Sequence, residues 1–193
     1  MASSGVQPYK YKYRRRLPHL QKDDAALFVT FCTFARFELS GEARQIVLEH
    51  SLREGGIQGF HQSSDRDGRP TRDSKAGEGA RPTSFRPRIR LHAAVVMPDH
   101  VHLLLSPLRD EVGWPFPLVG IMQSLKSVTA HRINKLLRRS GPVWEEESFD
   151  HVLRSDESLR EKIEYIRENP VRAGLVREVE EYRWLWVGPE SSK

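Results

Sequence analysis

The hydrophobic positions of this chain change period several times, and each period predicts one element. Residues 27–34 are almost continuously apolar, β-branched or aromatic, which is typical of a buried strand. Residues 89–96 and 100–105 form two further apolar runs, with only the turn 97–99 between them. Two strands joined by so short a turn predict an antiparallel hairpin.

Three other segments have the period of amphipathic helices. The first is expected from about Gly41 to Arg53, after Ser40, which is a good N-cap residue. The second covers Leu118–Arg139. The third is expected from Asp156 to about Glu168, because Pro170 should terminate it.

A short alternating segment, residues 148–154, lies between the second and third helices and predicts a fourth strand. It would place Phe149, His151 and Leu153 on one face. The resulting order is strand, helix, strand, strand, helix, strand, helix. This order predicts an α+β fold of ferredoxin-like type, with two helices on one side of an antiparallel sheet and one helix appended.

The domain organisation follows from the same pattern. Residues 1–22 form a basic N-terminal arm, residues 23–187 a single domain, and residues 188–193 a tail. Residues 55–88 hold six of the 13 glycines and three prolines, so we expect a flexible insertion in the domain.

Composition excludes several classes of protein. Hydrophobic residues make up 38% of the 193-residue chain, which is enough for one modest core. The single cysteine, Cys32, excludes an internal disulfide framework and a thiolate zinc cluster. The chain has no apolar run of the roughly 18 residues that cross a bilayer, and no hydrophobic region follows its basic start. We therefore expect a cytoplasmic protein with no membrane partner.

The charge distribution points to a polyanion. The formal net charge is +5, and residues 1–22, 81–92 and 118–144 each carry several basic side chains and no acid. Such blocks favour nucleic acid as the partner, although solvated surface segments could produce the same pattern. The candidates for phosphate contacts are Arg14, Arg15, Arg16, Lys126, Arg132 and, on the last helix, Lys162.

The strongest local signal is the sequence His100-Val101-His102 within a predicted strand. Side chains alternate along a strand, so both imidazoles leave the same face about 7 Å apart. Neighbouring neutral imidazoles are a common start to a divalent-metal site. Taken alone, the pair is also compatible with two ordinary histidines on a polar face.

The last predicted helix adds a second group of polar side chains. Its buried stripe would consist of Leu159, Ile163 and Ile166. Tyr165 lies off that stripe. Asn169 is only about 40° from Tyr165 around the helix, at 100° per residue. One flank thus presents a phenol and an amide oxygen, although a tyrosine at a helix edge is also frequent in purely structural helices.

Together, the two elements suggest phosphoryl-transfer chemistry. The imidazoles of His100 and His102 and the amide oxygen of Asn169 would hold Mg²⁺ or Mn²⁺, leaving positions for a phosphate oxygen. Tyr165 would then attack phosphorus and form a covalent phosphotyrosine.

These residues resemble a known family. The segment 96–105, Val-Met-Pro-Asp-His-Val-His-Leu-Leu-Leu, is similar to the HUH signature (His, hydrophobic residue, His) of single-tyrosine transposases. The segment 163–176, Ile-Glu-Tyr-Ile-Arg-Glu-Asn-Pro-Val-Arg-Ala-Gly-Leu-Val, resembles the catalytic-helix motif of REP-associated tyrosine transposases. The resemblance covers nearly all of residues 13–187 except the insertion.

The resemblance implies an RRM-like antiparallel sheet with the HUH motif on a central strand and a C-terminal catalytic helix. It also implies cleavage and rejoining of hairpin-containing single-stranded DNA through a 5′-phosphotyrosine, with His100, His102 and Asn169 as metal ligands and Tyr165 as nucleophile. The long insertion departs from the family pattern and puts the choice of DNA substrate in doubt.

Two alternatives remain open on sequence alone. The chain could bind structured DNA or RNA without catalysis, using the sheet face and the basic blocks. A replication or mobilisation initiator would use the same chemistry, but the small size of the chain disfavours it. Either a monomer or a homodimer is compatible with the sequence.

Overall fold

The computed structural model describes residues 25–57, 86–153 and 155–189. The basic arm, with Arg14, Arg15 and Arg16, and most of the expected insertion lie outside the described residues. In chain order the strands and α-helices are β1 (Leu27–Cys32), α1 (Gly41–Glu54), β2 (Ile89–Val96), β3 (His100–Pro107), α2 (Leu118–Leu136), β4 (Phe149–Val152), α3 (Asp156–Arg172) and β5 (Leu185–Val187). Two short 3-10 helices, η1 (Phe34–Arg36) and η2 (Val179–Glu181), follow β1 and α3.

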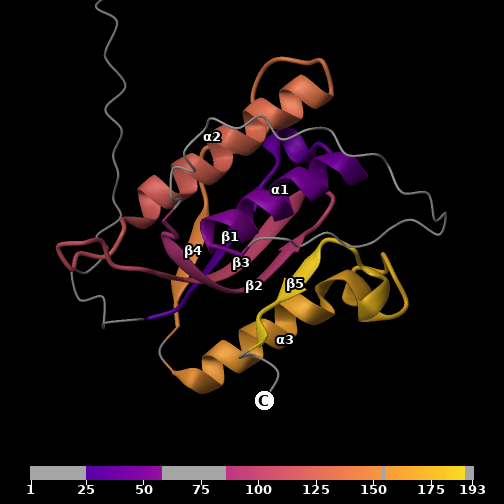
Figure 1. The fold of residues 1–193 in the computed structure, drawn as a ribbon. Coiled ribbons are helices and arrows are strands. Elements are labelled where there is room, and N and C mark those ends of the chain that lie inside the picture. The colour runs from indigo at the N-terminus through magenta and orange to yellow at the C-terminus, as the bar shows by residue number, and fades with distance from the viewer. Residues whose placement is uncertain (1–24, 58–85, 154, 190–193) are drawn as a thin grey trace, which may run out of the picture.

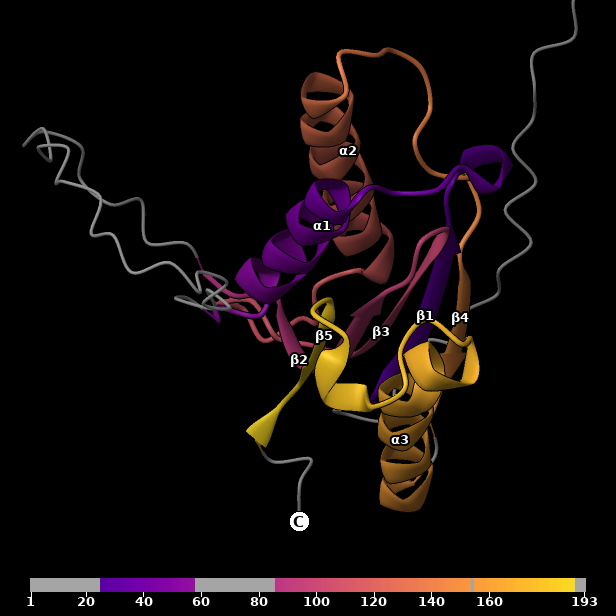
Figure 2. The ribbon, with the colours of Figure 1, turned by 90° about the vertical axis from the view of Figure 1, so that its right-hand side faces the viewer.

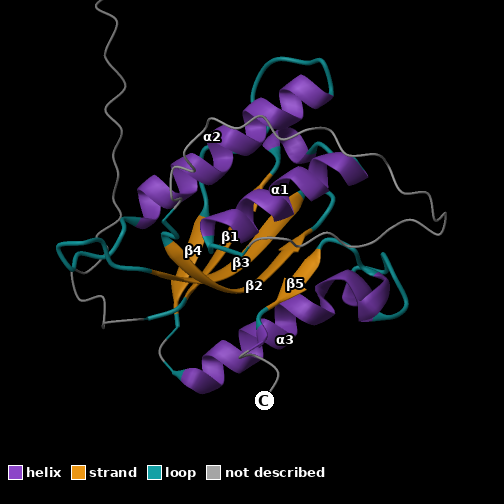
Figure 3. Ribbon diagram, in the orientation of Figure 1, coloured by secondary structure: helices purple, strands orange, loops and turns teal. Residues whose placement is uncertain are grey.

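The strands form one antiparallel sheet in the order β4-β1-β3-β2-β5. The predicted hairpin is present, because β2 pairs with β3 and the backbone N–H of Met97 donates to the carbonyl of His100 at 2.8 Å. The central strands β1 and β3 pair in a register that sets Thr30 opposite His102 and Cys32 opposite His100. The expected α+β fold with an antiparallel sheet is confirmed, as the ribbon in Figure 3 shows.

Helices cover the two faces of the sheet unequally. Helices α1 and α2 lie together over one face, and α3 lies on the opposite side (Figures 1 and 2). The alternation of side chains along β3 divides its residues between the two layers: Val101, Leu103 and Leu105 enter the cluster under α1 and α2, and Leu104 enters the cluster under α3. Strand β3, which carries His100 and His102, is therefore a central strand packed on both faces.

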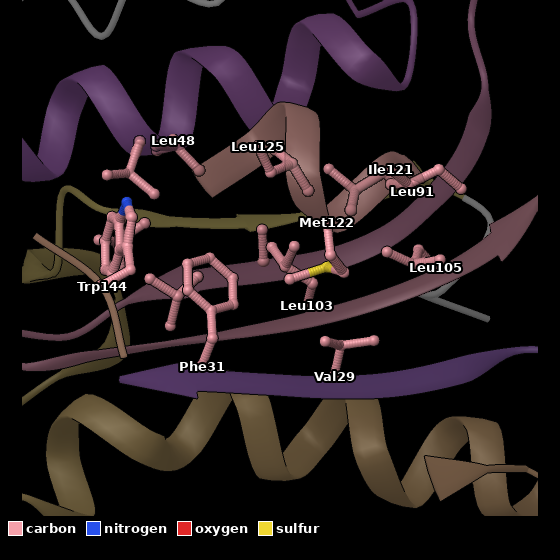
Figure 4. Close-up of a cluster of buried hydrophobic side chains, with 14 of the residues drawn as sticks. Val29, Phe31, Leu48, Leu91, Leu103, Leu105, Ile121, Met122, Leu125 and Trp144 are labelled. Atoms are coloured by element: carbon pink, nitrogen blue, oxygen red, sulfur yellow. The ribbon is translucent and has the colours of Figure 1, made fainter. Parts of the chain in front are cut away.

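The larger apolar cluster lies between the sheet and the helices α1 and α2, as Figure 4 shows. Its fully buried side chains include Phe31, Leu48, Leu103 and Leu125. The side chain of Trp144 closes one end of this cluster and donates its indole N–H to the hydroxyl of Thr129 at 2.9 Å. This layer holds β1 and β3 in place, so the side chains on the opposite face of these strands keep fixed relative positions.

The expected helix starts are correct. The Ser40 hydroxyl accepts a hydrogen bond from the Ala43 N–H at 3.3 Å at the start of α1. The hydroxyl of Ser155 accepts one from the Ser158 N–H at 3.2 Å at the start of α3. Each side-chain oxygen satisfies an N–H group that has no partner within its helix.

The expected end of the last helix is wrong. Helix α3 continues through Pro170 to Arg172 and ends where Gly174 takes a φ of +69°. A proline costs the helix its own N–H bond, but Pro170 lies in the last turn and is itself buried. The turn is closed by hydrogen bonds from the N–H of Ala173 to Asn169 and from the N–H of Leu175 to Pro170.

Other boundaries also differ from those expected. Helix α2 ends at Leu136, ahead of Arg138, which has a φ of +48°. A fifth strand, β5, was not predicted; it is only three residues long and pairs with β2. No helix among the described residues is both long and apolar enough to cross a membrane.

Candidate active site

His100 and His102 lie at the start of strand β3, on the face of the sheet that carries α3. Their ring centroids are 4.8 Å apart and the rings are inclined by 73°. The side chain of His102 is 6% exposed, whereas that of His100 is half-buried. The pair therefore runs from the partly exposed start of β3 into the buried part of this face.

Each imidazole is oriented by a partner on its Nδ1 atom. The Nδ1 of His102 is 2.8 Å from the hydroxyl oxygen of Thr30 on β1, and the Nδ1 of His100 is 2.6 Å from a carboxylate oxygen of Asp99. A partner at Nδ1 leaves Nε2 as the remaining ring nitrogen for a ligand, which is how metal-binding histidines are usually held. The donor set therefore fits a divalent cation.

Burial keeps His102 neutral. Desolvation, with smaller contributions from His100 and Lys162, lowers the pKa of His102 to about 3. A neutral imidazole keeps a lone pair and carries no charge that would oppose a cation at physiological pH.

Asp99 is held as a carboxylate. Its partial burial opposes ionisation, but hydrogen bonding and charge interactions with His100 and Arg36 outweigh burial and lower the pKa of Asp99. Asp99 also bonds the Nη1 of Arg36 at 3.0 Å. Its backbone carbonyl accepts from both the N–H (2.8 Å) and the hydroxyl (3.0 Å) of Thr33. The turn before the histidines is thus fastened to the end of β1.

The short 3-10 helix η1, which contains Arg36, has a strained backbone. Ala35 and Arg36 have φ angles of +52° and +57°, in the left-handed region that non-glycine residues rarely adopt. The Ala35 N–H donates to a carboxylate oxygen of Glu145 at 2.9 Å, which helps to hold this conformation. Strain of this kind is concentrated around functional sites, and here it accompanies the surface ion pair between Arg36 and Asp99.

Helix α3 brings Tyr165 to the histidines. The Tyr165 ring meets the His102 ring edge-on, with 5.6 Å between centroids and an interplanar angle of 69°. It also meets Phe28 edge-on at 5.8 Å, and Phe28 stacks on His102 at 5.2 Å. Phe28 therefore contacts both rings within the apolar cluster between the sheet and α3.

Two cations flank the tyrosine. The Nζ of Lys162 is 5.3 Å from the centroid of the Tyr165 ring, and the guanidinium carbon of Arg172 is 5.7 Å from it. Asn169 is one helical turn beyond Tyr165 and is half-buried. These four residues share one side of α3, because they are spaced by three or four positions.

The structure does not bring the other basic candidates to this site. The Nζ of Lys126 donates to the backbone carbonyls of Glu145, Glu146 and Glu147 at 2.9 to 3.1 Å, so it fastens the loop before β4. Arg132 pairs with Glu49 of α1 at 3.6 Å. Both belong to α2, on the opposite face of the sheet from α3.

Among the described residues, no three histidine, cysteine or acidic side chains are grouped to hold a metal ion. A third protein ligand would therefore be of another type, and the Asn169 amide is the candidate from the sequence.

Sequence reasoning missed three contributors. Arg172 was missed because the helix was expected to end before it. Thr30 and Phe28 come from another strand, so only the pairing register reveals them. A polar threonine within the apolar run 27–31 was the available signal for Thr30.

No family model matches the chain. A protein of Haemophilus influenzae (strain ATCC 51907 / DSM 11121 / KW20 / Rd) named "Putative REP-associated tyrosine transposase" is 25% identical over 95 residues, which are 47% of this chain and 54% of that protein. A second protein of the same strain, described only as uncharacterized, is 23% identical over 103 residues, 45% of this chain and 57% of its own length.

The chain thus matches little more than half the length of these curated relatives. Among solved structures, a REP-associated tyrosine transposase bound to a REP hairpin has a TM-score of 0.55 at 16% identity, covering 84% of this chain and 76% of that one. This likeness shows a shared fold. The resemblance to REP-associated tyrosine transposases that the sequence motifs indicated is confirmed.

Proposed function

We propose that this chain is a metal-dependent transposase of the REP-associated tyrosine type. It would cut and rejoin hairpin-containing single-stranded DNA, with Tyr165 as the nucleophile. The observation that carries the proposal is the contact of the Tyr165 ring with His102, within an oriented pair of imidazoles. The name of the curated relative supports the same class of activity.

The ligands of the metal would be the Nε2 atoms of His100 and His102 and the amide oxygen of Asn169. Their partners support this role, since the carboxylate of Asp99 and the hydroxyl of Thr30 already occupy both Nδ1 atoms. A bound Mg²⁺ or Mn²⁺ withdraws charge from phosphorus and stabilises the charge that builds up during displacement.

The covalent step exchanges one phosphoester bond for another, with solvent as the source and acceptor of protons. The Tyr165 hydroxyl gives up its proton to solvent, and its oxygen attacks the scissile phosphorus. The bond between phosphorus and the 3′ oxygen breaks, and that oxygen takes up a proton to become a free 3′-OH. The DNA end remains as a 5′-phosphotyrosine, and attack by a 3′-OH reverses the step without ATP.

The two cations beside Tyr165 suit this chemistry. Lys162 and Arg172 lie on either side of the ring along the helix, at 5.3 and 5.7 Å from its centroid. Positive charge attracts the phosphates of the DNA backbone. We assign these two residues to phosphate binding at the site.

Hairpin DNA is the proposed partner. The solved neighbour is described as bound to a REP hairpin, and this chain shares its fold. A basic N-terminal segment and a net charge of +5 favour a polyanionic ligand. The proposed setting is the cytoplasm, where the DNA is accessible.

The test is to mix the full chain with end-labelled hairpin oligonucleotides and Mn²⁺, and to look for a complex that survives denaturation. The proposal predicts such a complex with the native chain, its absence with EDTA, and its absence with Tyr165→Phe, which keeps the ring contacts. Binding without any covalent complex across a panel of hairpins would favour the alternative, a non-catalytic nucleic-acid binder.

A further inference from the structure

An exposed aromatic side chain lies in register with the proposed site. Phe149 begins β4 and is 62% exposed. It pairs with Thr30, which in turn pairs with His102 on the next strand. Residues directly opposite one another in a sheet leave the same face. Phe149, Thr30 and His102 therefore form a row across the sheet, on the face that carries α3.

Helix α3 does not cover this end of the row. It packs mainly over β2 and β3, whereas β4 is at the opposite edge of the sheet. The chain leaves β4 at its other end, through the buried Leu153, before entering α3. His151, opposite Phe28, is also exposed and lies on the same face. The face of the sheet thus continues from the histidines to an edge that none of the described helices covers.

A single exposed phenylalanine is ordinary on a protein surface, so exposure alone indicates nothing. The position of Phe149, in register with Thr30 and His102, is what suggests a role. Strands in a sheet are about 4.8 Å apart, which places Phe149 about 10 Å from His102 across β1. A nucleotide close to a phosphate bound at the histidines would reach this distance. The side chain leaves the sheet on the α3 face and is largely exposed, so its ring is accessible to a base.

We propose that Phe149 is a stacking platform for a base of the single strand that adjoins the hairpin, next to the scissile phosphate. This inference rests on the proposed function, because the DNA is placed by the His100 and Tyr165 site. Aromatic side chains bind bases of any sequence through their π-faces, and such stacking is a general device of single-strand binding.

The charges around this row indicate the path that the single-stranded DNA would take. Lys162 lies on the α3 side, with its Nζ 5.0 Å from the centroid of the Phe28 ring. Glu146 and Glu147 are exposed just before β4 and repel phosphates. The sugar–phosphate backbone of the DNA would therefore follow the α3 side of the row, and the base would turn toward Phe149.

Continuity with the site favours DNA over a protein partner. The outer edge of β4 has no partner strand among the described residues, so pairing with a strand of another chain is the competing use of this edge. Strand pairing would use the backbone of β4 and would not depend on the Phe149 ring. The two uses are separable by substitution of that ring.

The experiment compares Phe149→Ala, Phe149→Trp and the native chain on two probes: a labelled blunt hairpin, and the same hairpin with single-stranded flanks. We expect Phe149→Ala to bind the flanked hairpin about tenfold more weakly (1.4 kcal/mol) and the blunt hairpin as the native chain does. Phe149→Trp should retain the affinity. Val152→Ala is the matched control, because Val152 is on β4 but faces the other side, opposite Leu27.

A series of flanked hairpins with one abasic position then locates the stacked base. At that position the native chain and Phe149→Ala should bind equally. Equal binding of Phe149→Ala and the native chain to the intact flanked hairpin would overturn the inference. An equal loss on blunt and flanked hairpins would also overturn it, as a folding effect. Neither result touches the proposed function, which fails separately if the native chain forms no covalent complex with any hairpin.

Discussion

The ring of Tyr165 stands edge-on to the imidazole of His102, with 5.6 Å between the two centroids. The two residues come from different elements, helix α3 and strand β3, and Phe28 of β1 packs against both. A contact that depends on three elements exists only in the folded chain. The proposed nucleophile and the proposed metal ligand are therefore assembled by the fold itself.

The low pKa of His102 predicts a stability that depends on pH. In the unfolded chain this histidine titrates near 6.5, and in the folded chain near 3, so between these values the unfolded state binds more protons. The free energy of unfolding should fall as pH drops from 6.5 toward 4, by up to about 1.4 kcal/mol per pH unit from this group.

Urea denaturation of the native chain and of His102→Gln in EDTA, at pH 4, 5 and 6.5, measures that dependence. The variant should show a shallower loss of stability over this range. His50 adds to the loss in both proteins, because its burial also lowers its pKa. Parallel curves for the two proteins would contradict the assignment to His102.

Asp99→Asn is predicted to weaken metal binding without removing it. The substitution takes away the carboxylate that bonds the Nδ1 of His100 at 2.6 Å and also pairs with Arg36. Loss of such a supporting group typically lowers metal affinity about 10- to 100-fold. The measurement is the Mn²⁺ concentration at half-maximal formation of the covalent complex.

Arg36→Ala is the comparison for that experiment. The Arg36 side chain is 64% exposed, so its pair with Asp99 is a surface ion pair that contributes little. We expect only a small change in the half-maximal Mn²⁺ concentration. A native value with Asp99→Asn would show that this carboxylate does not orient His100.

Lys162 and Lys126 should respond differently to removal of their charges. Lys162→Met should reduce the slope of log affinity against log salt by about 0.7 for single-stranded DNA, because one phosphate contact is lost. Lys126→Met should instead lower stability by about 1–3 kcal/mol, because its Nζ bonds three loop carbonyls. Salt titrations of DNA binding and thermal melts of both variants make the comparison.

Arg172→Met belongs to the same set and should act as Lys162→Met does. If Lys126→Met changes the salt slope and Lys162→Met leaves it unaltered, the phosphates approach from the α2 side, and the assignment of the DNA path is wrong.

Local signals in the sequence were enough for most of the fold. The turn 97–99 and the apolar runs beside it predicted the β2–β3 hairpin, and alternation placed His100 and His102 on one face. The caps at Ser40 and Ser155 marked the starts of two helices. Such features depend on neighbours within a few residues, so a single sequence contains them.

Features that depend on packing were beyond the sequence. Pro170 suggested a helix end, but burial of its ring in the last turn lets α3 continue to Arg172. Strand β5 has only three residues, and it exists because the edge of β2 is available for pairing. The partner of His102, Thr30, follows from the register of β1 against β3, which no local pattern specifies.

Peptide mapping of the covalent complex identifies the tyrosine that is linked to the DNA. After the reaction with a hairpin and Mn²⁺, trypsin should release residues 163–167, which contain Tyr165, and residues 178–183, which contain Tyr182. Tyr182 is the internal control, since its hydroxyl is buried and donates to the Val96 carbonyl at 2.8 Å. We expect nucleotide mass on the peptide 163–167 alone, as the assignment of Tyr165 as nucleophile requires. Nucleotide mass on another peptide, or on none, would contradict it.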